Sequence, residues 1–473
     1  MARDDRYEKL GKPNNSGVGS GFSAAKIISG LVVIALLGAG FYMIHGGFAS
    51  GEDTFAVVFD AGSTGSRVHV FRFNVVGTNL ELKEEVFEAL KPGFRAFATD
   101  PKAAADSLDP LLEIVRKTVP EDKRATTPMT LRATAGIRLL PEGQAAAQAI
   151  MDAVDAKLKA EGFYYENDYV SVLGGDSEGV FGWLAVNYLL GKLGKPYEQT
   201  GAMTDMGGGS MQMAYAVSDE VAAKAPEGYV REINYGGSKY NLYVKSYAGY
   251  GIMAGRAKIL QQTADADGTH ACVPKGFSGG CKTKCYGLQP GEGYDAVARE
   301  AGANFEECLQ GAITALGKSN PCVVEGECSF AGEWAPPLKH TLYAMSYFYE
   351  RPEQALAAHP SKPEAQVAFK PKSLAEVGPA VCSTPDEEIK SKYPDSEDEH
   401  RTYLCLDVAY QYALLTEGFG ISPNTEVQLV SKIPFNGQGI EAAWPMGDAL
   451  EVLGDLMKGD KAKESKAESR KMM

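Results

Sequence analysis

Two widely separated stretches of the chain share one pattern of apolar and polar positions. In the first, the apolar run 55–59 leads into Asp60 and a glycine-rich turn, and apolar residues recur at 68, 70, 71 and 73. In the second, residues 201–204 lead into Asp205 and a turn of three glycines, and apolar residues alternate over 211–217. Such alternation is typical of half-buried strands. Both stretches therefore predict a strand, an aspartate, a tight turn with hydroxyls and a second strand.

The remaining periodicity predicts a mixture of helices and strands. Helical apolar spacing marks 103–119, 145–158, 178–193 and 404–415, and short apolar runs mark strands at 129–135 and 169–173. Residues 265–293 are rich in glycine and cysteine and predict irregular structure. The proline-rich, charged stretch 352–400 predicts surface loops and short helices, and the Lys- and Glu-rich end of the chain predicts disorder.

One segment near the N-terminus is long and apolar enough to cross a bilayer. Residues 27–44 are uncharged and mostly apolar. A cleaved signal peptide or a buried helix is the alternative, but the 26 residues before the segment are many for a signal peptide. We expect a retained signal anchor, with its basic flank in the cytosol and the body of the chain in the lumen or outside the cell.

Cysteine usage agrees with a translocated body. All eight cysteines lie between residues 272 and 405. An even number in a translocated domain predicts four disulfides. The alternative is a zinc site, for which Cys281, Cys285 and His270 are the nearest grouping, but no second close Cys pair follows.

The length and charge restrict the class of protein further. At 473 residues the chain exceeds the size at which one core stops growing, so we expect two lobes. The formal net charge is −14, and both ends are slightly basic, so the body is more acidic than the whole. Nucleic-acid binding needs a basic surface, so we expect no nucleic-acid partner. A phosphorylated small molecule remains compatible if a divalent cation bridges the charges.

The two glycine-rich turns have the chemistry of a phosphate grip. Glycine permits a tight turn and lets backbone N–H groups approach an anion. Arg67 adds a charge, although its alternation with Val68 can turn it outward. The candidate phosphate-binding residues are Gly62, Ser63, Thr64, Gly65, Ser66 and Arg67 in the first turn and Gly207, Gly208, Gly209 and Ser210 in the second.

Three carboxylates complete the candidate chemistry. Asp60 and Asp205 can face a metal ion through water, and their hard oxygens suit Mg²⁺ or Ca²⁺. Glu178 opens an apolar helix, where a carboxylate often only complements the helix dipole. Between two phosphate loops, Glu178 is a candidate general base for water. Two unrelated turns rich in Asp and Gly are the alternative interpretation.

Five segments resemble the five apyrase-conserved regions of the GDA1/CD39 nucleoside di- and triphosphatase family, in the family's order and spacing. They are VVFDAGSTGSRVHVFRF (57–73), LRATAGIRLLP (131–141), LGGDSEGVFGWLAVNYLLG (173–191), AMTDMGGGSMQMAY (202–215) and GIEAAWPMGDALE (439–451). Residues 342–354 and 403–423 also resemble the plant- and Golgi-type branch. Departures from the family pattern are Ser177 for Glu, Gly209 for Ala and Met211 for Thr.

The resemblance implies roles for individual residues. It makes Glu178 the catalytic base and places Ser210 and Gln212 beside the attacking water. Asp60 and Asp205 orient the water shell of a Ca²⁺ or Mg²⁺ ion, with Mn²⁺ a further candidate, and Trp444 lies close to the metal. Thr134 and Ala135 lie near the terminal phosphate. For the base of the nucleotide, Tyr349, Tyr403 and Arg401 are candidates by location.

The resemblance also implies an α/β fold of two RNase H-like lobes of the actin/hexokinase superfamily, with an N-terminal transmembrane helix. It implies the disulfides Cys322–Cys328, Cys382–Cys405, Cys272–Cys308 and Cys281–Cys285. The expected parts are a cytosolic tail (1–26), a transmembrane signal anchor (27–44), a stem (45–52), lobe I (53–174 and 436–457), lobe II with the disulfides (175–435) and a basic disordered tail (458–473).

We therefore expect an apyrase or nucleoside diphosphatase. The reaction would release phosphate from nucleoside di- or triphosphates, in a single-pass type II membrane protein facing the Golgi lumen. A cell-surface or secreted form is the competing location. An exopolyphosphatase of the same superfamily and a non-enzymatic ATP-binding protein are the competing functions. The oligomeric state is not predicted.

Overall fold

The computed structural model describes residues 51, 53–62, 64–77, 79–140, 142–235, 237–282, 285–289, 291–356, 366–394, 396 and 398–471, with only the backbone for 398, 399 and 459–471. The predictions for Ser63, for the tail 1–26, for the anchor 27–44 and for nearly all of the stem lie outside these residues. Among the helices of the described part, none is both long and apolar enough to span a membrane.

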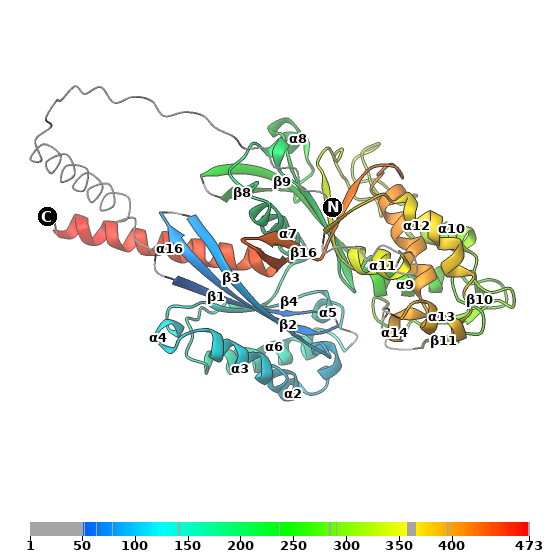
Figure 1. Ribbon diagram of the computed structural model, residues 1–473, viewed down its shortest axis with the longest axis horizontal. Helices are drawn as coiled ribbons and strands as arrows, with labels where there is room; N and C mark the ends of the chain where they lie inside the picture. Colours follow the sequence, from blue (N-terminus) through cyan, green and yellow to red (C-terminus); the bar gives the residue numbers. More distant parts are fainter. Residues whose placement is uncertain are drawn as a thin grey trace, which may run out of the picture. The chain divides into compact units, whose positions relative to one another are not determined.

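The first sheet of this mixed α/β fold has five strands in the order β3-β2-β1-β4-β5 (Figure 1). β1 pairs antiparallel with β2 and parallel with β4. The strands are β1 (Asp53–Ala61), β2 (Ser66–Val76), β3 (Asn79–Leu90), β4 (Met129–Ala133) and β5 (Val170–Val172). The helices in this part of the chain are η1 (Phe94–Phe97), α2 (Pro101–Asp106), α3 (Asp109–Thr118), α4 (Glu121–Arg124), α5 (Ala135–Arg138) and α6 (Gln144–Lys159).

β1 is buried on both faces because its side chains alternate between two cores. Val57 and Phe59 pack in one core with residues of α3 and α6. Ala56 and Val58 point the other way and pack in a second core with residues of α7 (Gly175–Leu189) and α16 (Pro445–Lys471). The sheet thus holds the end of β1, where Asp60 lies, between two packed layers.

The second sheet has seven strands in the order β14-β15-β13-β6-β7-β9-β8. Its strands are β6 (Ala202–Met206), β7 (Ser210–Val217), β8 (Val230–Tyr235), β9 (Ser238–Ala248), β13 (Leu342–Ser346), β14 (Gln366–Phe369) and β15 (Val427–Val430). The second core continues under this sheet through Met203, Ala214 and Val244. α7 and α16 therefore pack in a core that residues of both sheets share.

Shorter elements and helices complete the described chain. The strands are β10 (Thr269–His270), β11 (Ser278–Cys281), β12 (Tyr294–Ala298), β16 (Lys432–Phe435) and β17 (Gln438–Glu441). The helices are η2 (Tyr197–Gln199), α8 (Asp219–Lys224), α9 (Ile252–Gln262), α10 (Phe305–Ala315), α11 (Tyr347–Leu356), α12 (Lys372–Cys382), α13 (Asp386–Lys392), α14 (Asp398–Arg401), α15 (Leu404–Ala413) and the π-helical turn η3 (Leu414–Gly418).

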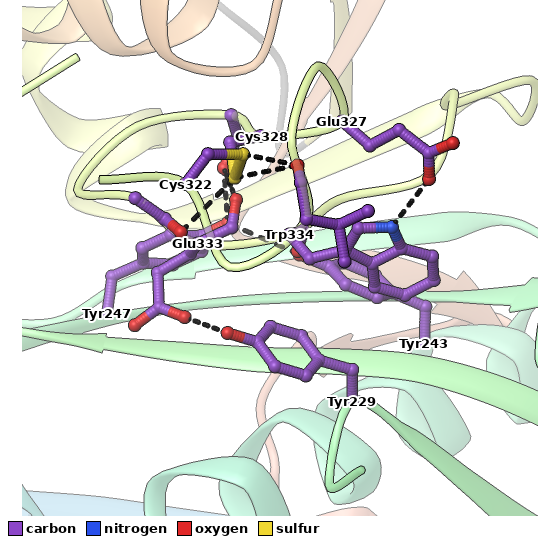
Figure 2. The surroundings of a disulfide bond; sticks show 11 residues. Tyr229, Tyr243, Tyr247, Cys322, Glu327, Cys328, Glu333 and Trp334 are labelled. Atoms are coloured by element: carbon purple, nitrogen blue, oxygen red, sulfur yellow. Dashed lines mark hydrogen bonds between the residues drawn. A yellow bond between two sulfur atoms is a disulfide. The ribbon is translucent and has the colours of Figure 1, made fainter. Parts of the chain in front are cut away.

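All eight cysteines are paired, which confirms the four predicted disulfides. The pairs are Cys272–Cys308, Cys281–Cys285, Cys322–Cys328 and Cys382–Cys405. Figure 2 shows the third pair in an aromatic surrounding, where the indole of Trp334 donates to Glu327 (2.9 Å) and Tyr243 donates to the Trp334 carbonyl (3.1 Å). Since every thiol is used, the cysteines are not available as zinc ligands.

Three sequence predictions need correction. The helix predicted over 103–119 is divided into α2 and α3, because Pro110 starts a new helix at its second position. The stretch 352–400 contains a buried helix, α12, whose Leu374 and Val381 enter the large core of the second sheet. The tail predicted to be disordered is helical as far as Lys471, since its Lys, Glu and Ala residues favour a helix.

Candidate active site

The two predicted turns lie beside one cavity. Its volume is about 300 Å³. Carboxylates from three elements line it: Asp60 at the end of β1, Asp205 in β6 and Glu178 in the first turn of α7. Sequence positions far apart therefore meet in the cavity as predicted.

The two turns have the same backbone geometry. The N–H of Gly62, two residues after Asp60, donates to the Gly65 carbonyl (3.0 Å). The N–H of Gly207, two residues after Asp205, donates to the Ser210 carbonyl (3.0 Å). The register also matches, because Asp60 lies opposite Arg67 across its hairpin and Asp205 lies opposite Gln212 across the other. The repeated pattern in the sequence thus corresponds to a repeated hairpin.

The N-terminus of α9 holds the second turn from behind. The backbone N–H groups of Ile252 and Met253 donate to the carbonyls of Gly207 and Gly208 (both 2.9 Å). In a trans peptide the C=O of one residue points opposite to the N–H of the next. With the carbonyls directed at α9, the N–H groups of Gly208 and Gly209 point away from this helix, where a phosphate can accept hydrogen bonds from them.

The family departure at Gly209 has a structural reason. A β-carbon built on Gly209 would lie 2.3 Å from the hydroxyl oxygen of Tyr286 and 3.0 Å from the β-carbon of Ala135. Tyr286 is itself held beneath the guanidinium of Arg95, whose central carbon lies 4.7 Å from the ring centroid. An alanine at position 209 would therefore require the tyrosine to move.

Glu178 is buried and is held by neighbouring polar groups. Its Oε2 accepts hydrogen bonds from Arg138 Nη2 and from Gln212 Nε2, both at 3.2 Å. Arg138 and Gln212 also donate to the Ser210 hydroxyl oxygen, at 3.2 and 2.9 Å. Arg138 is fixed in turn by a hydrogen bond to the Leu173 carbonyl. The three side chains predicted to act at the water, Glu178, Ser210 and Gln212, form one hydrogen-bonded group.

The electrostatics of Glu178 are those of a base that gains protons readily. Burial raises the pKa of its carboxyl to about 8, Arg138 opposes the increase, and the charges of Asp205 and Asp60 add to it. Such a pKa lies near neutral pH, where general-base catalysis is most effective.

The two aspartates have buried carboxylate oxygens at the cavity. Burial raises the pKa of Asp60, and it raises the pKa of Asp205 to about 6. One oxygen of each carboxylate, Oδ1, is buried and has no hydrogen-bond partner among the described residues. Buried carboxylates with free oxygens in one cavity fit a hydrated Mg²⁺ or Ca²⁺ ion, which would supply both the charge and the hydrogen-bond donors.

Most of the remaining predicted residues lie at the cavity wall. Gly62, Thr64, Arg67, Thr134, Ala135, Gly207, Gly208, Ser210, Tyr349 and Trp444 line it. Gly65, Ser66, Gly209 and Gln212 belong to the same hairpins but are not part of the lining. Tyr403 and Arg401 are not part of this lining: Tyr403 stacks under Arg256, and Arg401 donates to the Ser396 carbonyl.

Sequence reasoning missed several residues at the cavity. Arg138 lies in a segment that resembles the family, yet it received no role. The sequence could have indicated Arg138, because it lies four residues after Thr134 and so on the same short helical turn. Lys91, Tyr347 and Glu441 also line the cavity. They come from the end of β3, the start of α11 and the end of β17, and only the tertiary structure brings these ends together.

Known proteins that are similar to this chain are nucleotide hydrolases. Apyrase 1 of Arabidopsis thaliana is 40% identical over 86% of this chain and 87% of its own length. The guanosine-diphosphatase of Candida albicans is 32% identical over 84% of this chain and 70% of its own. The crystal structure of nucleoside triphosphate hydrolases from Neospora caninum matches 89% of this chain and 96% of that chain, with a TM-score of 0.62 and 14% identity, which shows a common fold.

The fold and the cavity are those of a phosphatase that acts on small phosphorylated molecules. Residues 48–466 match the GDA1/CD39 (nucleoside phosphatase) family, and the chain belongs to this family.

Proposed function

We propose that this protein is a divalent-metal-dependent enzyme that hydrolyses nucleoside 5'-di- and triphosphates to the shorter nucleotide and phosphate. The observation that carries the proposal is the position of Glu178 beside two matching phosphate turns, each with its own aspartate. A buried carboxylate beside the phosphate turns can take the proton of an attacking water.

Glu178 accepts the proton of the attacking water. Its pKa of about 8 allows the carboxylate to take the proton as the new P–O bond forms. The water attacks the terminal phosphorus in line, and the bond to the bridging oxygen breaks, so no covalent enzyme intermediate is needed. Ser210 and Gln212 hold the water beside Glu178, since Gln212 donates both to Glu178 and to the Ser210 hydroxyl oxygen.

The two turns hold the phosphates. Backbone N–H groups of Gly208 and Gly209, with Thr64 and Arg67 across the cavity, stabilise the charge that grows on the phosphoryl oxygens. Asp60 and Asp205 would hold the water shell of Ca²⁺, Mg²⁺ or Mn²⁺, and Trp444 lines the same cavity. When bound, the ion neutralises phosphate charge.

The nucleoside binds at the tyrosine side of the cavity. Tyr349 is the only one of the three candidates for base binding that lines it. Its ring offers a stacking surface, although its hydroxyl interacts with Ser431.

We further propose the arrangement of the chain. The body consists of two RNase H-like lobes of the actin/hexokinase type, lobe I from 53–174 and 436–457 and lobe II from 175–435. The apolar segment 27–44 anchors it as a type II protein of the Golgi, and the four disulfides suit a luminal body. There, removal of nucleoside diphosphates would support glycosyl transfer.

The Glu178→Gln variant tests the mechanism. Glutamine keeps the size and cannot take the proton, so phosphate release should fall by about a hundredfold or more. Nucleotide binding, measured by equilibrium dialysis with a non-hydrolysable analogue, should persist. Near-normal hydrolysis by the variant would contradict the proposal. Glu166→Gln, an exposed glutamate elsewhere on the surface, is the matched control and should keep full activity.

A substrate panel separates the alternatives. Phosphate release is measured from GDP, UDP, ADP, ATP and long-chain polyphosphate with Ca²⁺, Mg²⁺ and Mn²⁺ in turn. Turnover of the nucleotides and not of polyphosphate supports the proposal. A preference for polyphosphate supports an exopolyphosphatase, and binding of ATP without steady phosphate release supports a non-enzymatic role.

A further inference from the structure

The first turn contains an internal ion pair at the place where a metal is expected. Arg67 Nη1 donates to Oδ2 of Asp60 at 3.1 Å. Asp60 is buried, and its other oxygen has no partner among the described residues. The arginine therefore occupies one of the two oxygens that this carboxylate could offer to the water shell of a cation.

The second hairpin has no arginine at the position that corresponds to Arg67. Arg67 and Gln212 hold equivalent positions, each directly opposite the aspartate of its own hairpin. Gln212 is neutral and contacts Glu178 and Ser210, leaving Asp205 to face the cavity. The site is therefore asymmetric: Asp60 is paired with a guanidinium, whereas Asp205 has a hydrogen bond with Ser346 and no ion pair among the described residues.

Arg67 has other negative groups within reach. Its side chain is about one-third exposed and lines the cavity, so it has room to turn. Burial lowers the pKa of its guanidinium, but Asp60, then Glu441, Tyr347 and Glu350 raise it, and the net change is upward. Glu441 and Glu350 lie on the cavity wall with Arg67. A substrate phosphate in the cavity would add a further acceptor.

We propose that Arg67 is a resident cation on Asp60 that a divalent ion must displace, and that phosphate in the cavity assists this displacement. The proposal rests on the hydrolase function proposed above and adds a coupling between metal and nucleotide. In the free protein Arg67 neutralises Asp60 and competes with the metal. With a nucleotide bound, Arg67 turns to the phosphate and releases the carboxylate. Each ligand then favours the binding of the other, as linkage requires.

The coupling has a use in catalysis. A cavity with three buried carboxylates would otherwise collect free divalent ions without substrate. With Arg67 in place, the complete site forms when the metal and the nucleotide arrive together. Arg67 thus contacts the phosphate when nucleotide is bound and sets the metal affinity of Asp60 when it is not.

The test measures Mn²⁺ binding to the full-length protein by electron paramagnetic resonance at pH 8, without nucleotide. Arg67→Gln copies the residue of the second hairpin and should bind Mn²⁺ about tenfold more tightly than the unaltered protein, the effect of removing one charged hydrogen bond. Arg67→Lys keeps the charge and should remain close to the unaltered protein. A methylene-bridged nucleoside diphosphate should tighten Mn²⁺ binding less in Arg67→Gln than in the unaltered protein.

The matched control is Arg72→Gln. Arg72 lies on the same strand and pairs with Asp53 and Glu84 at the surface, so its loss should leave Mn²⁺ affinity unchanged. Equal or weaker Mn²⁺ binding by Arg67→Gln, in a protein with an unchanged melting temperature, would overturn the inference. If the unaltered protein still hydrolyses nucleotides and Glu178→Gln does not, that result leaves the proposed function standing.

Discussion

Glu178 illustrates how a single side chain acquires its chemistry from its neighbours. Burial favours its protonated form, and the nearby charges of Asp205 and Asp60 act in the same direction. Arg138 acts in the opposite direction through a hydrogen bond of 3.2 Å. The balance leaves the carboxyl with a pKa of about 8 in place of its usual 4.5. Burial therefore dominates the pH range in which the base is ionised, and the guanidinium of Arg138 limits the increase of the pKa.

The pH profile of hydrolysis should reveal this balance. Because only ionised Glu178 accepts a proton, kcat/KM should rise with pH as Glu178 ionises. With metal bound the midpoint should lie below about 8, since the cation offsets the charges of Asp205 and Asp60 that raise the pKa of Glu178. Arg138→Gln removes the charge that lowers the pKa, so the rising limb should move to higher pH. The measurement is kcat/KM from pH 5 to 10 with saturating metal. An unchanged limb in the variant would contradict the role of Arg138.

The raised pKa of Glu178 also predicts how the stability of the fold depends on pH. A carboxyl with a raised pKa in the folded protein stabilises the fold fully below its unfolded value, about 4.5, and this contribution is lost as the pH rises through about 8. Glu178→Gln cannot ionise, so its melting temperature should exceed that of the unaltered protein, and the excess should grow between pH 5 and 9. This result would also show that the variant loses activity without losing its fold.

At the scale of elements, the N-terminus of α9 supports the second turn. Gly251 precedes this helix, and a β-carbon built there would lie 2.6 Å from the Gly207 carbonyl oxygen and from Gly209 N. Its φ of −65° is open to any residue, so the constraint is space alone. The helix can approach the turn, and direct its N–H groups at the carbonyls of the turn, only because a glycine lies between them.

Gly251→Ala should therefore displace the second turn. We expect a fall in kcat/KM of about a hundredfold, since small displacements of a phosphate-binding group are costly. Gly454→Ala in α16 is the control: nothing lies within 4 Å of its β-carbon, and alanine in a helix adds about 0.5–1 kcal/mol of stability. Steady-state kinetics on both variants would check this. Full activity in Gly251→Ala would contradict the support role of α9.

At the scale of the whole molecule, the last helix ties the end of the chain to the first sheet. Asp448 of α16 is fully buried. It accepts hydrogen bonds from Thr130 (2.7 Å) and from Arg132 Nε (3.1 Å), both on β4. β4 runs parallel to β1, which ends at Asp60, so this link also steadies the first phosphate turn.

Asp448→Ala should destabilise the fold by about 3–5 kcal/mol, because it leaves Arg132 without its buried partner. Asp455→Ala on the same helix is the matched control. Asp455 is exposed and pairs with Lys458 three residues later, so its loss should cost less than about 0.5 kcal/mol. Urea unfolding of both variants measures the difference, and equal midpoints would contradict the structural role of Asp448.

The sequence by itself determined the local parts of this protein. The hairpins around Asp60 and Asp205 followed from alternation and glycine, because strand period and turn chemistry are local properties. The resemblance to a family then gave the four disulfides and the residues that meet in the cavity. The split of α2 from α3 was readable in principle from Pro110, whereas α12 was hidden by the charge and proline content of its surroundings.

Only the tertiary structure decided what each charge faces. No local pattern shows that Arg138 binds Glu178, that Tyr286 lies against Gly209 or that Arg67 turns inward to Asp60. These contacts join residues on different elements, and their energies depend on burial, which the sequence does not state. The sequence thus determined which chemical groups are present, and the packing of the two sheets determined their pKa values and their partners.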